Sequence, residues 1–329
     1  MKTDKISPAV ANTRDAHMAG EVQYYLSQQP RQLPSRYFYD ALGSALFEAI
    51  CRLPWYGITR AELRLLRAYG REVVRQLDPL STLVELGSGS GEKLVALLEA
   101  GRGASQPLNL HLVDISPAAL ASSSYTLRGL DDVRVITHEA SYETGLADIS
   151  RRPRARGRRL VLFLGSNIGN FDHPGADAFL RAIRASLGTG DGLLLGADLV
   201  KSEPALRLAY DDPLGITAAF NRNLLVRLNR ELDSDFDVSA FAHRATWNAA
   251  ESRVEMHLVS LGRQRVRIPA AQLDFVLEEG ESIWTESSYK YRPEGIATML
   301  ERSGFTVGSQ WIDDEGGFAL TLASLKSEG

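Results

Sequence analysis

The central part of the chain alternates between short apolar runs and amphipathic stretches, and this alternation limits the fold more than any other feature. Apolar runs that predict strands lie at 82–86, 110–115, 133–137, 159–164 and 193–199. Between these runs, stretches such as 92–100 and 177–186 have apolar residues at helical spacing. Alternating strands and helices predict an α/β fold, in which helices cover both faces of a parallel sheet.

The C-terminal part departs from this alternation. After a final helix at 293–303, residues 305–312 and 318–325 read as two strands that a short turn, DDEGG, joins into an antiparallel pair. A parallel sheet that ends in an antiparallel hairpin is typical of Rossmann-like class I methyltransferases, whereas nicotinamide-binding sheets generally finish parallel. We therefore predict a sheet of the methyltransferase type.

A second interruption lies between the fifth predicted strand and the final helix. Residues 201–283 contain a long helical stretch near 216–232. Short predicted strands follow this stretch at 253–261, 266–269 and 273–277. We interpret the segment as an insertion that carries its own small sheet.

The first 60 residues are rich in aromatic side chains and precede the sheet. Because this N-terminal part and the insertion both lie outside the alternating region, we predict two domains. The methyltransferase domain would comprise 61–199 and 286–329. A smaller α+β substrate-binding cap domain would comprise 1–60 and 200–285.

Composition and charge narrow the possible partners. The 329 residues are 44% hydrophobic and 24% charged, with a net charge of −4 and no long basic block, so nucleic acid is an unfavourable partner. The sequence has no 18-residue apolar window and no apolar signal-peptide core, and we expect a cytoplasmic monomer that does not bind a membrane. The single cysteine, Cys51, excludes an internal disulfide and a cysteine-based zinc cluster. The six histidines show no metal-binding spacing, so no metal is expected.

The stretch VELGSGSGEKL, from 84 to 94, places Gly87, Gly89 and Gly91 between a predicted strand and a predicted helix. Glycine permits positive φ and lets a ligand approach the backbone. The dinucleotide fingerprint would need a glycine where Glu92 stands, and a carboxylate at that helix N-terminus would repel a pyrophosphate. Lys93 is misplaced for a Walker phosphate loop. The turn is therefore unsuited to phosphate.

Two carboxylates favour S-adenosylmethionine, which has a positive sulfonium, a ribose diol and an amino-acid tail. Glu85 lies on the strand before the turn and can face a positive part of the ligand. Asp114 closes the next strand, where a carboxylate can accept two ribose hydroxyls. The alternative interpretation is a plain strand–turn–helix whose glycines serve only packing.

Six sequence blocks together resemble the histidine-specific methyltransferases, which make the Nα-trimethylhistidine betaine, hercynine, on the way to ergothioneine. The blocks are YFYDALGSALFEAICRLPWYGITRAE, ELGSGSGEK, FLGSNIGNF, AYDD, EMHL and TESSYKY. They are spread from residue 37 to residue 291, so the resemblance covers most of the chain. The glycine block is common to many methyltransferases, whereas the aromatic N-terminal block and the GSNIGN block are much more specific.

The resemblance implies a role for particular residues. The methyl donor would be contacted by Gly87, Lys93 and Asp114, beside Glu85 and Gly89. The substrate amine would lie beside Tyr39 and Tyr56. The substrate backbone would be held by Gly165, Asn170 and Tyr210. The imidazole ring would be bound by Glu286 and Ser288, with Met256 packing near it.

The chain departs from the family pattern at two places. The family commonly has LPEYYPTR where this chain has LPWYGITR, so Trp55 and Gly57 flank Tyr56. An aspartate–aromatic pair often meets the adenine of the donor, and the corresponding pair here is Ser141 and Tyr142. We expect Ser141 to hydrogen-bond the adenine more weakly than a carboxylate would.

The chemistry of these residue types agrees with such a reaction. Methyl transfer needs a neutral amine held in line with the donor carbon, and positioning can supply about 7–11 kcal/mol of the barrier reduction. We expect Tyr39 to orient the amine and to help its proton leave. Glu286 and Ser288 are two residues apart, so on a strand they face the same side. One carboxylate acceptor and one hydroxyl suit the two nitrogens of an imidazole.

The leading hypothesis is therefore an S-adenosylmethionine-dependent Nα-methyltransferase that acts on free L-histidine in successive transfers. A second hypothesis keeps the donor and changes the acceptor to another small amine, such as tryptophan, in secondary metabolism. A third, from another class, is a regulatory protein that binds the cofactor without turnover.

Overall fold

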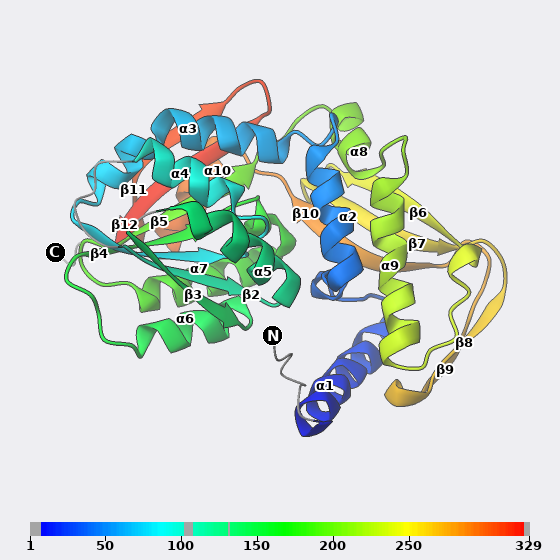
Figure 1. The fold of residues 1–329 in the computed structure, drawn as a ribbon. Coiled ribbons are helices and arrows are strands. Elements are labelled where there is room, and N and C mark those ends of the chain that lie inside the picture. The colour runs from blue at the N-terminus through cyan, green and yellow to red at the C-terminus, as the bar shows by residue number, and fades with distance from the viewer. Residues whose placement is uncertain (1–7, 102–107, 131, 326–329) are drawn as a thin grey trace. The chain divides into compact units, whose positions relative to one another are not determined.

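The computed structural model describes residues 8–101, 108–130 and 132–325, and Figure 1 shows its helices and strands. The chain divides into two compact units, each made of three chain segments. The large unit comprises Glu48–Ala209, Asn248–Val254 and Ser287–Gly329. The small unit comprises Met1–Phe47, Tyr210–Trp247 and Glu255–Glu286. The roles expected for the two parts of the chain, donor binding and substrate binding, stay predictions.

The large unit is built around a seven-stranded sheet with the order β11-β12-β5-β4-β1-β2-β3. The strands are β1 (Leu80–Leu86), β2 (Leu108–Asp114), β3 (Val133–Glu139), β4 (Arg158–Phe163), β5 (Gly192–Asp198), β11 (Phe305–Asp313) and β12 (Phe318–Leu325). Strands β1 to β5 pair in parallel, whereas β12 pairs antiparallel with both β5 and β11. The predicted α/β fold with an antiparallel C-terminal hairpin is confirmed.

Helices cover both faces of this sheet, as Figure 1 shows for α3 and α4 on one side and α6 and α7 on the other. The helices of the large unit are α3 (Ile58–Gln76), α4 (Glu92–Ala100), α5 (Pro117–Thr126), α6 (Tyr142–Ser150), α7 (His173–Ser186) and α10 (Pro293–Arg302). Two further helices, α2 (Ala41–Arg52) and α8 (Glu203–Tyr210), continue from one unit into the other.

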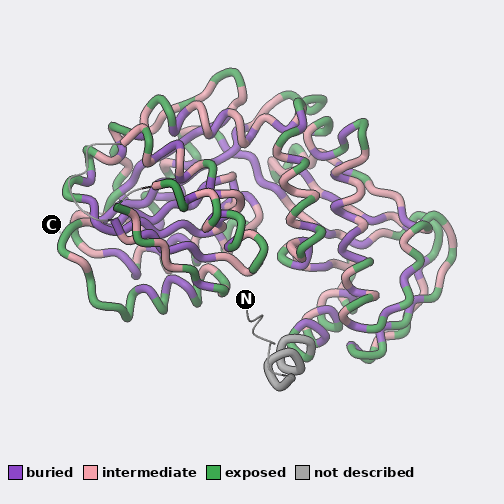
Figure 2. The backbone as a smooth tube through the Cα atoms, viewed as in Figure 1, coloured by how far each residue is buried: buried purple, intermediate pink, exposed green. Residues whose placement is uncertain are grey.

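The two faces of β1 meet different helices. Val84 and Leu86 belong to the core that contains Leu146 of α6 and Phe179 of α7. Because side chains alternate along a strand, Glu85 points to the opposite face. Every residue of β1 and of β5 is buried, as expected for central parallel strands, and Figure 2 shows this burial in purple. The face that holds Glu85 is the one covered by α3 and α4, which pack on each other.

The small unit combines helices with two small sheets. Its helices are α1 (Pro8–Leu26), α9 (Ile216–Glu231) and the short turns η1 (Ser35–Phe38), η4 (Val238–Ala240) and η5 (Pro269–Ala271). Its strands are β6 (Phe241–Asn248), β7 (Arg253–Ser260), β8 (Gln264–Ile268), β9 (Leu273–Leu277) and β10 (Ser282–Tyr289); one end of β6, of β7 and of β10 is assigned to the large unit. The sheets have the orders β10-β7-β6 and β8-β9. The expected long helix and the three strands of the insertion are confirmed.

Two strands of the insertion were not expected from the sequence. In β6 only Phe241 and Ala245 are buried, four residues apart, so the strand lacks a two-residue alternation. In β10 the buried positions include the polar Thr285 and Ser288, which hide the strand pattern. Among the helices of the described residues, none has an apolar stretch long enough to cross a membrane.

Candidate functional site

The loop between β1 and α4 has the backbone that its glycines predict. Gly87, Gly89 and Gly91 have φ of +86°, +47° and +80°. A Cβ atom at Gly87 would lie 2.9 Å from the amide nitrogen of Asn167 and 3.1 Å from the hydroxyl of Tyr142. A side chain at Gly87 would therefore be strained by both its backbone and its neighbours. The loop is held closely against the segment that begins at Gly165.

Asp114, at the end of β2, fastens this loop to the next strand. Its Oδ2 accepts from the Ser88 N–H at 3.0 Å, and its Oδ1 accepts from the Ser116 N–H at 2.8 Å. Burial raises the pKa of Asp114, and the backbone hydrogen bonds partly oppose that rise. The backbone N–H groups of Gly89 and Ile115 also interact with this carboxylate, so Asp114 holds the backbone on both sides of the expected diol site.

Glu85 lies beneath the loop as a buried carboxylate with an unsatisfied atom. It is 2% exposed, and its Oε2 has no hydrogen-bond partner among the described residues. Burial raises the pKa of Glu85 well above its ordinary value; Lys93 opposes this rise, and Glu62 and Asp114 add to it. An unpartnered buried oxygen costs free energy, so this position is suited to a ligand that donates a hydrogen bond or brings positive charge.

Lys93 of α4 forms an ion pair with Glu62 of α3, with Nζ 2.6 Å from Oε2. Burial alone would lower the pKa of Lys93, but the Glu62 carboxylate outweighs it and the pKa is raised. Both carboxylate oxygens of Glu62 also accept from the Gly165 N–H at 2.9 Å. A Cβ atom at Gly196 would lie 2.0 Å from Glu62 Oε1, so the absence of a side chain on β5 makes room for this carboxylate.

Glu62 was not among the predicted site residues, although it stands in the aromatic N-terminal block. It is completely buried and lies on the same face of α3 as Ile58, Ala61 and Leu65. An acidic residue on the apolar face of an amphipathic helix is the signal that identifies it, because a buried carboxylate needs a partner.

The turn that carries the GSNIGN block joins several of the predicted residues. A Cβ atom at Gly165 would lie 3.0 Å from Lys93 Nζ, which places the start of the turn beside the ion pair. At its other end, a Cβ atom at Gly169 would lie 2.7 Å from the carbonyl oxygen of Tyr289. Asn170 ends the short helix η3 (Asn167–Asn170), which this turn forms. The turn thus connects the glycine loop with the end of β10, where Ser288 precedes Tyr289.

Tyr56 is buried in the large unit, just before α3. Gly57, which replaces a tyrosine of the family pattern, has φ of −78°, a conformation that any residue adopts. A Cβ atom there would meet nothing within 4 Å. The backbone beside Tyr56 therefore accommodates the family tyrosine as readily as the glycine.

Ser141 and Tyr142 follow β3 but have structural contacts of different kinds. Ser141 is exposed and caps α6, where its Oγ accepts from the Thr144 N–H at 3.3 Å. The ring of Tyr142 packs on Phe163, with centroids 5.4 Å apart, and its hydroxyl lies under Gly87. Burial raises the pKa of this hydroxyl. Adenine contact by this pair stays a prediction, and the structure adds that Tyr142 supports the glycine loop.

In the small unit, Tyr39 stands in an aromatic cluster. Its ring meets Phe47 and Phe220 edge to face, with centroid distances of 5.6 Å and 5.8 Å. Phe38 is fully buried against Phe220 at 4.5 Å, so it is a core residue. These contacts fix the direction of the Tyr39 ring.

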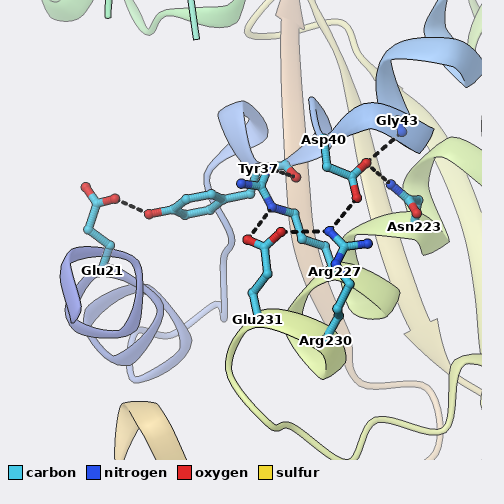
Figure 3. Close-up of polar contacts among 8 residues, drawn as sticks. All are labelled: Glu21, Tyr37, Asp40, Gly43, Asn223, Arg227, Arg230 and Glu231. Carbon is cyan, nitrogen blue, oxygen red and sulfur yellow. Dashed lines mark hydrogen bonds and ion pairs between the residues drawn. The ribbon is translucent and has the colours of Figure 1, made fainter. Parts of the chain in front are cut away.

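Asp40, the next residue, is the centre of a polar cluster that Figure 3 shows. Its Oδ1 accepts from the Gly43 N–H at 2.7 Å and from Asn223 Nδ2 at 2.8 Å, and its Oδ2 accepts from Arg230 at 2.7 Å. Burial opposes the ionised form, but these bonds outweigh it and lower the pKa of Asp40. Asp40 therefore joins the first turn of α2 to α9 immediately beside Tyr39.

A second polar chain links Tyr210 to Met256 within the small unit. The carbonyl of Tyr210 accepts from His243 Nε2 at 2.8 Å, and His243 Nδ1 accepts from Asn221 Nδ2 at 2.9 Å. Thr285 Oγ1 lies 2.8 Å from Asn221 Oδ1 and 3.0 Å from the carbonyl oxygen of Met256. Burial lowers the pKa of His243, which keeps the ring neutral and suits it to donate at one nitrogen and accept at the other.

The predicted residues therefore fall into two groups. Within the large unit, the structure brings together Glu85, Gly87, Gly89, Lys93, Asp114 and Gly165 around one loop. Ser141 stands apart from them at an exposed helix end. Tyr39, Tyr210, Met256 and Glu286 belong to the small unit. There Met256 is buried, whereas Glu286 is partly exposed on β10, opposite in direction to Thr285.

Comparison with known proteins decides the family. The family model for "histidine-specific methyltransferase, SAM-dependent" matches residues 18–325. This chain belongs to the histidine-specific methyltransferases. A histidine N-alpha-methyltransferase of Mycobacterium tuberculosis is 44% identical over 91% of this chain and 92% of its own length.

Two more distant relatives have other names. Ergothioneine biosynthesis protein 1 of Schizosaccharomyces pombe is 28% identical over 85% of this chain, which corresponds to 37% of that larger protein. A 4-dimethylallyltryptophan N-methyltransferase of Penicillium roqueforti is 26% identical over 90% of this chain and 91% of its own length. The relatives of this chain are thus named for different amino-acid acceptors.

The residues of the large unit fit the S-adenosylmethionine that the family uses. The buried hydroxyl oxygen of Ser88 and Oε2 of Glu85 have no protein partner among the described residues, and both belong to the loop region. The glycine backbone leaves the loop without side chains at three positions, and no phosphate-binding lysine follows it at Walker spacing. The polar side chains around the loop are carboxylates, one hydroxyl and one lysine. This combination suits a ligand with a cationic centre, a diol and an amino-acid tail.

Proposed function

We propose that this histidine-specific methyltransferase transfers methyl groups from S-adenosylmethionine to the α-amino nitrogen of free L-histidine, as far as the trimethyl betaine hercynine, for ergothioneine biosynthesis. The observation that carries the proposal is the 44% identity to a histidine N-alpha-methyltransferase over nine tenths of both chains. The Glu62–Lys93–Gly165 cluster supports it, because it joins the expected donor residues to a turn expected to hold the substrate.

S-adenosylmethionine, when bound, supplies an electrophilic methyl carbon on a sulfonium. We assign Asp114 to the ribose hydroxyls and Lys93 to the carboxylate of the donor tail. Glu85, which has an unpartnered oxygen, would accept a hydrogen bond or balance positive charge near the loop. These residues orient the donor, and orientation can supply about 7–11 kcal/mol of the barrier reduction in such a displacement.

On the acceptor side, the α-amine must lose a proton before it reacts, and its ordinary pKa is about 8 or higher. We assign Tyr39 to orienting this amine and guiding its proton away. The same aromatic face would stabilise the quaternary ammonium product by about 0.5–2 kcal/mol. Gly165, Asn170 and Tyr210 would hold the substrate backbone, with Tyr56 beside the amine.

The function is tested by incubating the purified protein with S-adenosylmethionine and a mixture of amino acids, and by measuring the masses of the products. We expect histidine to gain one, two and then three methyl groups while the other amino acids stay unchanged. Donor binding without methylation of any amino acid would instead indicate a regulatory cofactor-binding protein.

Replacing Glu286 by Ala should reduce the use of histidine, because one ring nitrogen would lose its carboxylate acceptor. We expect kcat/KM for histidine to fall at least about tenfold, since an unpaired polar group on the substrate is costly. Steady-state kinetics at saturating donor measure this. Glu278→Ala, on the exposed β8–β9 side of the same unit, is the matched control and should leave kcat/KM unchanged. If kcat/KM of Glu286→Ala with histidine equalled that of the wild type, Glu286 would not be the residue that binds the imidazole ring.

A second candidate keeps the chemistry and changes the acceptor to tryptophan or a related amine. The match to a 4-dimethylallyltryptophan N-methyltransferase over nine tenths of the chain favours it. Ser288 argues against it, because an indole has one ring N–H, which Glu286 can accept, and no second ring nitrogen for the Ser288 hydroxyl to meet. The product masses in the mixed amino-acid assay separate the two candidates directly.

A further inference from the structure

Lys290 is a buried lysine just beyond β10, and its ammonium touches a residue expected to bind the substrate ring. Its side chain is fully buried, with Nζ 2.9 Å from Ser288 Oγ and 3.1 Å from Asp198 Oδ2. Asp198, at the end of β5, is itself 1% exposed. These three side chains belong to the large unit and form a chain from carboxylate to ammonium to hydroxyl.

The chemistry of an ammonium fixes the direction of the bond to Ser288. A lysine ammonium has three donors and no acceptor, so Ser288 Oγ must accept from Lys290. The hydroxyl proton of Ser288 is then directed away from Lys290, toward another acceptor. A charged donor also polarises the hydroxyl and strengthens the bond that it donates.

We propose that Lys290 is a specificity-determining positioning residue, which makes the Ser288 hydroxyl a hydrogen-bond donor to the unprotonated ring nitrogen of the substrate imidazole. The inference rests on the proposed function. In this arrangement the two side chains of β10 have opposite roles: Glu286 accepts from the ring N–H, and Ser288 donates to the other nitrogen. A neutral imidazole has one nitrogen of each kind, whereas a phenyl ring has neither.

The surroundings of Lys290 allow it to be replaced without leaving a buried charge alone. Asp198 is also paired with Lys201, which is 22% exposed. Removing the Lys290 charge therefore leaves Asp198 with an ion-pair partner, which avoids the cost of an uncompensated buried carboxylate. Methionine has a similar length and no donor, so Lys290→Met removes the hydrogen bond and largely keeps the volume.

A double-mutant cycle tests the inference. Ser288→Ala, Lys290→Met and the double variant are titrated with histidine by calorimetry, at saturating S-adenosylhomocysteine. Each single change should weaken histidine binding by roughly tenfold or more, because a hydrogen bond to or from a polarised group is lost. The double variant should bind histidine no more weakly than whichever single variant has the lower affinity, since Lys290 acts through the Ser288 hydroxyl.

Lys201→Met is the matched control, because it removes the other lysine on Asp198 and leaves the Lys290–Ser288 bond. We expect its histidine affinity to stay within about twofold of the wild type. Affinity for S-adenosylhomocysteine should be unchanged in all variants. The inference is overturned if the effects of Ser288→Ala and Lys290→Met simply add, or if Lys290→Met loses donor affinity, which would give Lys290 a structural role.

Failure of the proposed function has a different signature. A wild-type protein that binds the donor but does not bind histidine contradicts the proposed function, and the imidazole contact with it. A wild-type protein that binds histidine but gives an additive cycle contradicts the role of Lys290 alone.

Discussion

Replacing Glu62 by Ala should lower the free energy of unfolding by about 3–5 kcal/mol and greatly weaken donor binding. The change leaves the Lys93 ammonium without its carboxylate and the Gly165 N–H without its acceptor, and breaking a buried ion pair from one side has a cost of this size. Donor binding should suffer because Lys93 would lose its fixed position. Urea unfolding measures the stability, and calorimetry with S-adenosylhomocysteine measures the donor affinity.

Glu72→Ala provides the matched control on the same helix. Glu72 is partly exposed on α3, and among the described residues it accepts an exposed hydrogen bond from Gln76 Nε2 at 3.1 Å. Its replacement should change stability by less than about 0.5 kcal/mol. A Glu62→Ala variant that unfolds and binds the donor as the wild type does would show that the buried cluster has no role in the site.

Replacing Asp40 by Ala should reduce turnover at least about tenfold and destabilise the protein by about 2–4 kcal/mol. The loss of stability has two parts. The Gly43 N–H at the start of α2 loses its acceptor, which costs about 1 kcal/mol, and the buried amide nitrogen of Asn223 loses its acceptor, which costs about 1–3 kcal/mol. We expect turnover to fall because Asp40 fixes the backbone directly after Tyr39. A small displacement of a group that positions the reacting amine lowers the rate strongly.

The measurement separates these effects. Initial rates with histidine at saturating donor give kcat, and S-adenosylhomocysteine titration shows whether the variant still binds at the donor site. We expect unchanged donor affinity together with the at least about tenfold lower kcat. Asp237→Ala, which removes an exposed aspartate cap in the same unit, should leave kcat unchanged. Wild-type turnover of Asp40→Ala would contradict the positioning role.

The sequence predicted the large unit well because the central strands of its sheet are buried on both faces. Every residue of β1 and β5 is buried and most of these residues are apolar, and the glycines between β1 and α4 need positive φ, so both the strand pattern and the turn chemistry could be recognised in the sequence. The antiparallel hairpin was visible because DDEGG separates its two strands.

Other features depend on contacts between distant segments, which no local pattern contains. The carboxylate of Glu62 meets Gly165 across 103 residues, and Asp40 meets Asn223 across 183. Likewise, β10 has polar buried residues because Thr285 bonds to Asn221 of α9. A buried polar residue is detectable in a sequence, but its partner is set by the tertiary fold.

The discontinuity of the small unit has a consequence for how the chain is made. On the ribosome, β1 to β5 emerge as nearly one continuous stretch, whereas the N-terminal 47 residues meet the rest of their unit only after Tyr210 has been translated. Until then, aromatic rings such as Phe38, which later pack on Phe220, have no native partner to cover them. A nascent chain stalled before Tyr210 should therefore be a better client of chaperones than one stalled after Glu286.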